Sequence, residues 1–103
     1  MAYDINELRA KFGRVEEIET AAGKLAFRKP TRHEWRKFKI AIAGEPEAMA
    51  SADDNLMLDT IVSHSREELA ALLDADPGIA STPGMTPLLK HLAGAAVSTE
   101  GKG

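Results

Sequence analysis

The segment from Pro30 to Glu34 constrains the fold of this chain more than any other part of the sequence. Proline has no amide hydrogen to give to a strand ladder, so a strand that reaches position 29 cannot continue through Pro30. Thr31 and Glu34 have the spacing of a capping box, in which their side chains bond to the free amides at a helix start. The segment therefore predicts a strand before position 30 and a helix after Thr31.

The residues before this boundary predict a short helix followed by a β-hairpin. Asp4 can cap a helix over 5–12, with Glu7 in the capping-box position. Positions 14–29 predict two strands joined by a turn at 21–24, where Gly23 can adopt a positive φ angle. A hairpin of two strands is only marginally stable alone, so we expect it to pack on helices.

Helices are expected after the hairpin. The helix that Thr31 caps should end at 44–46, and residues 45–50 should form a connection that is in part helical. A helix over 51–62 is expected next. On a wheel of 100° per residue, Leu56 lies about 160° from Leu58 and is expected to face away from the core.

The C-terminal third contains two further helix starts. Ser65 and Glu68 form another capping box, and the helix that they open should end at Asp76-Pro77-Gly78. Thr86 is expected to cap a last helix, with Pro87 as its first residue. The expected core is mostly aliphatic and comprises Ile18, Leu25, Phe27, Trp35, Phe38, Ile42, Leu58, Ile61, Val62, Leu69, Leu72, Leu73, Leu89 and Leu92.

These elements predict one α+β domain, mainly helical, with an N-terminal β-hairpin. A chain of 103 residues holds a single core, which we place in 1–94, with 95–103 as a flexible tail of small and polar residues. The chain has no cysteine, which excludes disulfides and thiolate metal sites and favours a reducing cytoplasm. Its apolar runs are too short to cross a bilayer, so no membrane contact is expected.

The sequence carries no recognisable catalytic or metal-binding pattern. His33, His64 and His91 lack ligand-like spacing, and the pattern Asp74-x-Asp76-x-Gly78 has Met85 where a calcium loop needs its glutamate. Ser63, His64 and Ser65 could suggest a nucleophile and a base, but adjacent residues in a turn between helices rarely face each other, and Ser65 already has a capping role. We therefore expect no catalytic residues, no cofactor and no metal, and no enzymatic activity.

Charge is strongly polarised along the chain. Positions 24–39 contain seven of the thirteen Lys and Arg residues and a single acid, for a net charge of +6. Positions 45–76 contain nine acids and one arginine, for a net charge of −8. Such polarity points to recognition of a partner, or to contact between copies of the chain in a homo-oligomer.

Three interpretations of the basic block stay open: a solvated helix face, a protein-binding surface and a nucleic-acid-binding surface. A solvated face is the commonest meaning of a charged stripe. A small nucleic-acid-binding or regulatory protein is the alternative function, although the whole chain is acidic and Trp35 and Phe38 are needed for the core. The candidate partner-binding residues are Arg28, Lys29, Arg32, Arg36, Lys37, Lys39, Ile40 and Leu56.

Five segments, taken in order, resemble one known protein family. They are Gly23–Trp35, Leu56–Val62, Ser65–Leu73, Asp76-Pro77-Gly78 and Leu88–Gly94. Together they resemble the small tail assembly chaperones of long-tailed bacteriophages and prophages, whose members show a hairpin, a Thr-capped helix, a helix opening with Ser-Arg-Glu-Glu-Leu or a similar run, and a C-terminal helical segment. The order and spacing of these elements carry the resemblance, over roughly 5–94.

The resemblance implies a non-enzymatic function in phage tail assembly. Such a protein would bind the tape measure protein in the cytoplasm of the bacterial host, keep that long helical chain in solution and help to recruit tail tube subunits. It would be absent from the finished virion. In many such phages a ribosomal frameshift extends a fraction of the protein.

Overall fold

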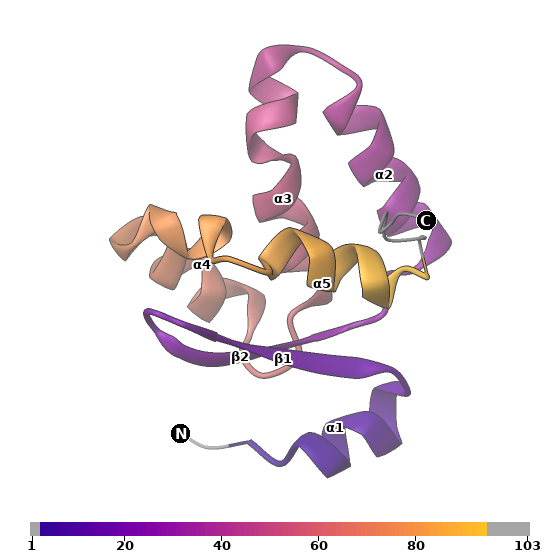
Figure 1. Ribbon diagram of the computed structural model, residues 1–103, viewed down its shortest axis with the longest axis vertical. Helices are drawn as coiled ribbons and strands as arrows, with labels where there is room; N and C mark the ends of the chain where they lie inside the picture. The colour runs from indigo at the N-terminus through magenta and orange to yellow at the C-terminus, as the bar shows by residue number, and fades with distance from the viewer. Residues whose placement is uncertain (1–2, 95–103) are drawn as a thin grey trace.

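The computed structural model describes residues 3–94. It confirms the predicted α+β class, mainly helical with an N-terminal hairpin, and Figure 1 shows the arrangement. The elements in chain order are α1 (Ile5–Phe12), β1 (Val15–Thr20), β2 (Gly23–Arg28), α2 (Arg32–Ile42), α3 (Pro46–Thr60), α4 (Arg66–Ala75), the 3₁₀ helix η1 (Pro77–Ser81) and α5 (Met85–Leu92). The predicted tail at 95–103 lies outside the residues described.

The hairpin forms the central layer of the molecule. Strands β1 and β2 are antiparallel, in a register that runs from Val15 opposite Arg28 to Thr20 opposite Gly23, whose φ is 97°. In Figure 1, α1 lies on one side of this ribbon and the other helices lie on the opposite side. The outer edge of β2 is covered by the segment after α3, where Phe27 pairs with Ile61 and the Val62 amide donates to the Ala26 carbonyl at 2.9 Å.

The local cap signals were read correctly at α2 and α4. Thr31 with Glu34, and Ser65 with Glu68, form complete capping boxes. At α1, Asp4 is the N-cap as predicted. Its carboxylate accepts from the amide of Asn6, whereas the predicted capping box would use the amide of Glu7.

The predictions for the other two helix starts were wrong. Helix α3 begins at Pro46, five residues earlier than expected. The fixed φ angle of proline suits the first position of a helix, and Ala48 and Ala50 have high helix propensity. It ends at Thr60, because Ile61 is extended and pairs with β2. Helix α5 begins at Met85 after a left-handed Gly84, so Thr86 lies inside the helix and does not cap it.

The core lies between the hairpin and the helices. Seven of its predicted members are buried: Leu25, Phe27, Phe38, Leu69, Leu73, Leu89 and Leu92. Five others are half-buried against it: Ile18, Trp35, Leu58, Ile61 and Leu72. Val62 is half-buried, whereas Ile42 is exposed. Buried residues that were not predicted are Val15, Ala26, Pro30, Ala52, Leu56, Met57, Thr60, Ile79 and Met85. Within 3–94, no helix is both long and apolar enough to cross a membrane.

Candidate functional site: the α2–α3 arm

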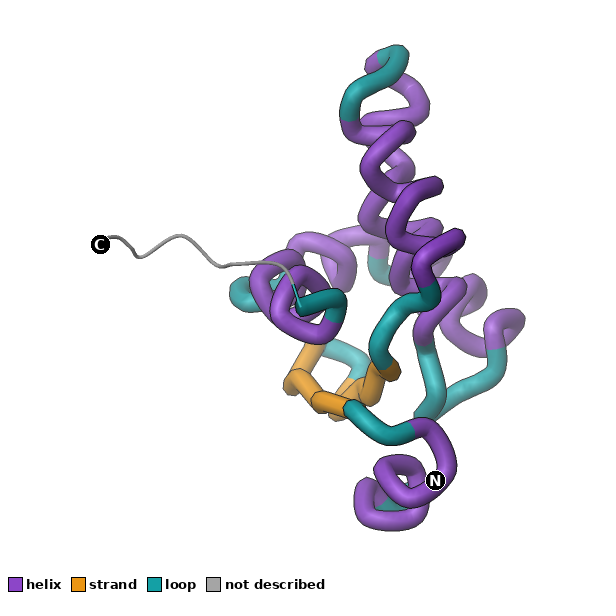
Figure 2. The backbone as a smooth tube through the Cα atoms, turned by 90° about the vertical axis from the view of Figure 1, so that its right-hand side faces the viewer, coloured by secondary structure: helices purple, strands orange, loops and turns teal. Residues whose placement is uncertain are grey.

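Helices α2 and α3 form an antiparallel pair that projects from the rest of the molecule. Figure 1 shows their connecting turn at the far end from the β-hairpin, and Figure 2 shows the same column of two helices after a quarter turn. Its base is fixed by the Thr31 capping box, where the Glu34 amide donates to Thr31 Oγ1 at 3.1 Å and the Thr31 amide donates to Glu34 Oε1 at 2.9 Å. We call residues 32–60 the arm.

The outer side of α2 carries the part of the basic block that remains free. Arg32, Arg36 and Lys39 are exposed, and the side of the helix that they share also holds Ile40, which is 67% exposed. Among the ion pairs within 3–94, none involves these three bases. We call Arg32, Arg36, Lys39 and Ile40 the α2 edge. Lys29, in the loop before α2, is also exposed.

Arg28 belongs to the internal framework, which corrects its prediction as a partner-binding residue. Its two terminal nitrogens donate to the two Glu34 oxygens at 2.9 and 2.8 Å, and Nη2 also donates to the Asp59 carbonyl at 2.7 Å. The hydrogen bonds to Glu34 raise the pKa of Arg28, and those from Arg28 lower the pKa of Glu34. The guanidinium thus ties the end of β2 to the start of α2 and the end of α3.

Lys37 is likewise engaged within the molecule. Its Nζ lies 3.1 Å from Asp59 Oδ2, while Arg66 Nη1 of α4 lies 2.7 Å from Asp59 Oδ1. Asp59 is therefore held between two cations, one from each neighbouring helix. The lysine side chain is half exposed, but its ammonium would have to leave Asp59 to pair with an acidic group of a partner.

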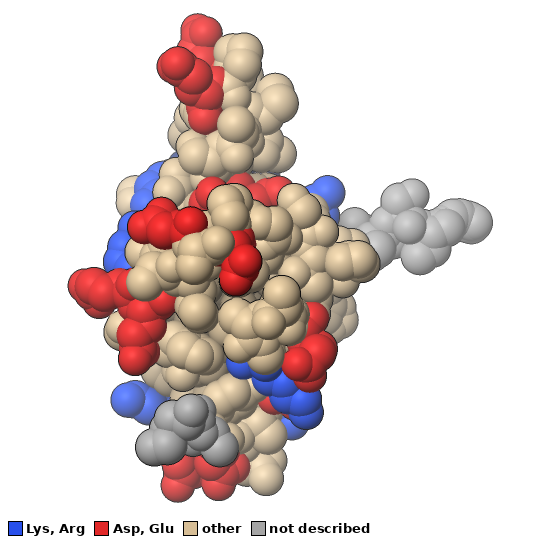
Figure 3. All heavy atoms as spheres, turned by 90° about the vertical axis from the view of Figure 1, so that its left-hand side faces the viewer, with Lys and Arg blue, Asp and Glu red and all other residues tan. Residues whose placement is uncertain are grey.

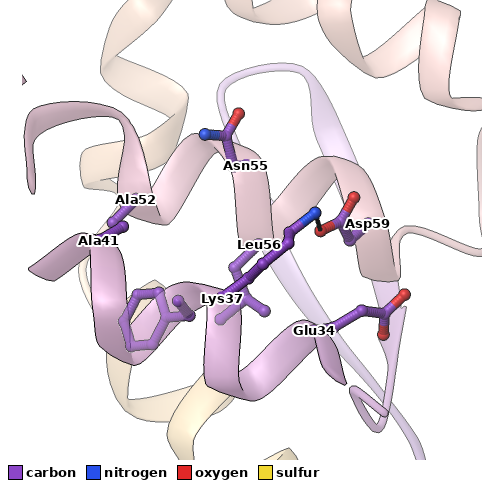
Figure 4. Close-up of a pocket in the computed structure, with 8 residues that line it drawn as sticks. Glu34, Lys37, Ala41, Ala52, Asn55, Leu56 and Asp59 are labelled. Atoms are coloured by element: carbon purple, nitrogen blue, oxygen red, sulfur yellow. Dashed lines mark ion pairs between the residues drawn. The ribbon is translucent and has the colours of Figure 1, made fainter. Parts of the chain in front are cut away.

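A groove of about 240 Å³ lies between α2 and α3. Figure 4 shows Leu56 behind Lys37, with the Lys37–Asp59 pair across the groove and Asn55 pointing outward. Its lining residues are Glu34, Lys37, Phe38, Ala41, Ala52, Asn55, Leu56 and Asp59. The lining is apolar at Phe38, Ala41, Ala52 and Leu56 and polar where Lys37 pairs with Asp59.

The prediction that Leu56 faces outward was wrong. Leu56 is 2% exposed and lines the groove together with Phe38. The reason is that α3 has two buried faces, one against α2 and one against α4, η1 and β2. A wheel that allows a single core direction places Leu56 outside. Leu56 is therefore no part of an exposed binding surface.

Acidic side chains lie on the side of the arm formed by α3. Glu45 and Glu47 are exposed at its far end, where Figure 3 shows a group of acidic atoms. Asp54 follows two turns after Glu47 and is half-buried, and burial, followed by the neighbouring Asp53, raises its pKa. Ala50 lies exposed between them. We call Glu47, Ala50 and Asp54 the α3 edge.

Sequence reasoning missed two exposed apolar residues near the end of the arm. Ile42 is 41% exposed and Met49 is 51% exposed. Ile42 follows Trp35 and Phe38 on one helical face, and Met49 precedes Ala52 and Leu56 on another. Both therefore continue buried stripes beyond the point where the rest of the molecule covers them. Their exposure could not be predicted, because the sequence does not show how far α2 and α3 extend beyond the helices and strands that cover them.

Titratable groups elsewhere serve the fold. The expectation that Ser63 and His64 do not face each other was wrong, because Ser63 Oγ lies 2.8 Å from His64 Nδ1. The same oxygen accepts from the Ala26 amide at 2.9 Å and so holds the edge of β2. Within 3–94, no group of three or more His, Cys, Asp or Glu residues is placed to hold a metal ion.

No family model matches the sequence, and no curated protein matches it. A solved structure, that of the uncharacterised protein rbstp2171 from Bacillus stearothermophilus, is similar with a TM-score of 0.70 and 28% sequence identity. The match covers 96% of this chain and all of that chain. The similarity therefore extends over nearly the whole α+β fold. Because that protein is uncharacterised, the similarity establishes the fold and no function.

Proposed function

We propose that this chain is a phage tail assembly chaperone that binds the tape measure protein, with the α2 edge as its client surface. The observation that carries the proposal is the free basic edge itself: three exposed cations without ion pairs in residues 3–94, beside an isoleucine that is two-thirds exposed. The order of capped helices that resembles the family supports the same proposal. The proposal assigns no catalytic role to any residue.

The chemistry of the α2 edge suits an acidic amphipathic helix. An apolar residue of the client would cover Ile40, while carboxylates flanking it would meet Arg36 and Lys39. A tape measure protein is expected to be a long helical chain, which offers many such stretches. Exposed ion pairs contribute only about 0–1 kcal/mol each, so a client bound in this way can be released when the tail tube forms around that client.

Reversing charge at Arg32 and Arg36 should weaken client binding and leave folding nearly intact. Both residues are exposed, and each exposed charge contributes only about 0–1 kcal/mol to stability. We expect the Arg32→Glu, Arg36→Glu variant to co-purify less of a co-expressed tape measure protein, most clearly at low salt, where screening is weakest. The Lys11→Glu, Lys90→Glu variant has the same change in net charge at exposed bases elsewhere and is the matched control. If the first variant folds and retains as much client as the control, the α2 edge is only a solvated surface.

Nucleic acid is the alternative ligand for the same cations. Phosphate contacts would make affinity fall steeply with salt, because they release counterions. Two observations weigh against nucleic acid. Glu47 and Asp54 on the same arm would repel phosphate, and none of the four residues of the α2 edge is aromatic, so none can stack on a base. We expect binding to DNA or RNA no tighter than about 10⁻⁵ M at physiological salt, measured by fluorescence anisotropy. Submicromolar binding that the Arg32→Glu, Arg36→Glu variant abolishes would favour the alternative.

A further inference from the structure

We propose that the outer edge of strand β1 binds an extended, basic segment of another protein as an added strand of the sheet. This surface lies on the hairpin, away from the α2 edge, and the inference does not depend on the proposed function. It rests on the register of the hairpin, on the unequal cover of its two edges and on the charge of β1.

The register of the hairpin decides which backbone groups of β1 point outward. The Lys29 amide donates to the Arg14 carbonyl at 3.1 Å, so these two residues form a hydrogen-bonded pair. Hydrogen-bonded and non-hydrogen-bonded pairs alternate along an antiparallel ladder. The β1 residues that bond to β2 are therefore Glu16, Ile18 and Thr20. The residues whose amides and carbonyls point away from β2 are Val15, Glu17 and Glu19.

The two outer edges of the hairpin are covered unequally. On β2, the Ala26 carbonyl accepts from the Val62 amide at 2.9 Å, and the Ala26 amide donates to Ser63 Oγ at 2.9 Å. On β1, the Val15 carbonyl accepts from Arg9 Nε at 3.2 Å.

The backbone groups of Glu17 and Glu19 make up what we call the β1 edge. Within residues 3–94, the outward amides and carbonyls of these two residues have no hydrogen-bond partner, and β1 pairs with no strand except β2. Helices lie on both sides of the hairpin in Figure 1, so its faces are covered while this edge is not. A row of unpaired amides and carbonyls is a template for a further strand.

The side chains of β1 favour a basic partner. The strand carries Glu16, Glu17 and Glu19 and no base. Glu16 lies 3.9 Å from Arg9, and Tyr3 donates its hydroxyl to Glu17 at 2.6 Å. Glu19 is exposed and has no ion pair within residues 3–94. Two β1 strands paired with each other would bring like charges together, which disfavours a second copy of the chain at this edge.

The two faces of β1 set the side-chain pattern of the partner. Glu17 points to the side of α1, where it meets Tyr3, and Glu19 shares this face because alternate residues of a strand point the same way. Ile18 points to the opposite side and is half-buried against the core. Neighbouring strands place their side chains next to each other on each face. The expected partner therefore alternates lysine or arginine, beside the glutamates, with an apolar residue beside Ile18.

The test is amide hydrogen exchange of the full-length chain, followed by NMR, with a short blocked peptide in which lysine and valine alternate. Without peptide, the amides of Glu17 and Glu19 should exchange fast and that of Ile18 slowly. The peptide should protect Glu17 and Glu19, leave Ile18 unchanged and act less as salt rises. Absence of this protection up to about 1 mM peptide would overturn the proposal, as would protection of both amides before peptide is added.

Substitutions at Glu19 separate the backbone contact from the charge. Glu19→Pro removes an outward amide and no bond to β2, so the hairpin should persist while the peptide binds roughly tenfold more weakly. Glu19→Lys should bind the lysine–valine peptide more weakly, and a glutamate–valine peptide more tightly, than wild type does. Asp74→Lys makes the corresponding change from acid to base at an exposed position of α4 and is the control, which should bind as wild type does.

The outcomes of these variants decide between a docking edge and a merely solvated one. Circular dichroism establishes that each variant is folded. Folded Glu19→Pro and Glu19→Lys that bind the lysine–valine peptide like wild type would overturn the proposal. Wild type that binds the glutamate–valine peptide equally well would overturn the basic character of the partner. Glu19→Pro leaves the α2 edge intact, so loss of peptide binding with retained client binding separates the β1 edge from the client surface.

Discussion

Replacing Phe27 with alanine is expected to lower the free energy of unfolding by about 3–5 kcal/mol. Phe27 is completely buried, lies opposite Glu16 in the hairpin and pairs on its other side with Ile61 after α3. The cavity left by the ring would therefore open where the hairpin meets the helical layer. A domain of this kind has a total stability of only about 5–15 kcal/mol, so the loss is a large fraction of it.

Urea unfolding followed by circular dichroism measures this effect, and Phe12→Ala is the matched control. Phe12 undergoes the same chemical change, but it is exposed at the end of α1, where the Lys11 ammonium lies 5.3 Å from the centre of its ring. We expect Phe12→Ala to cost less than about 1 kcal/mol. Similar losses in the two variants would contradict the assignment of Phe27 to the centre of the core.

The parts of the fold that could be predicted from the sequence are those set by neighbours in the chain. Thr31 and Ser65 cap their helices through amides three residues away, and Gly23 turns the hairpin by its own φ angle. Such signals need no knowledge of tertiary structure. The prediction of one α+β domain followed from them.

The parts that could not be predicted depend on which elements meet. Leu56 was placed outside because the sequence does not say that α3 packs between α2 and the α4 region. Met85 is completely buried although it precedes a helix start that had been assigned to Thr86. The error at Leu56 comes from a distant neighbour, since Phe38 on the other side of the groove lies 18 positions earlier. The error at Met85 comes from the left-handed Gly84, which starts the helix one residue before Thr86.

The sequence identified the basic residues of the candidate site, but it did not show which of them are exposed. The basic block is continuous in sequence, but the fold divides it into an internal and an external set. Arg28 and Lys37 turn inward because α3 runs back beside α2 and brings the Asp59 carbonyl and carboxylate to the base of the arm. Arg32, Arg36, Lys39 and Ile40 remain outside. The sequence alone could not separate them, because Asp59 lies 22 positions after Lys37.

The internal set predicts that Arg28→Met will destabilise the protein by about 2 kcal/mol at pH 7, as expected for a hydrogen bond between charged groups. Methionine keeps the aliphatic length but leaves the Glu34 carboxylate without its guanidinium, and the side chains of Arg28 and Glu34 are only 22% and 17% exposed. The Asp59 carbonyl loses its donor at the same time. Lys37→Met is the control: its ammonium is half exposed and Asp59 keeps Arg66, so we expect a loss below about 1 kcal/mol.

The same variant should change how stability depends on pH. Arg28 first, and then the Thr31 amide, hold the pKa of Glu34 below its ordinary value, so folding favours the ionised carboxylate. This contribution is fully present above the unfolded pKa, about 4.3, and is lost as pH falls through the lower pKa of the folded state. The difference in unfolding free energy between wild type and Arg28→Met should therefore be largest near pH 7 and shrink below pH about 4. Urea unfolding at pH 7, 5 and 3 measures it. A difference that stays constant over this range would mean that Arg28 acts through its carbonyl contacts and that its charge does not stabilise ionised Glu34.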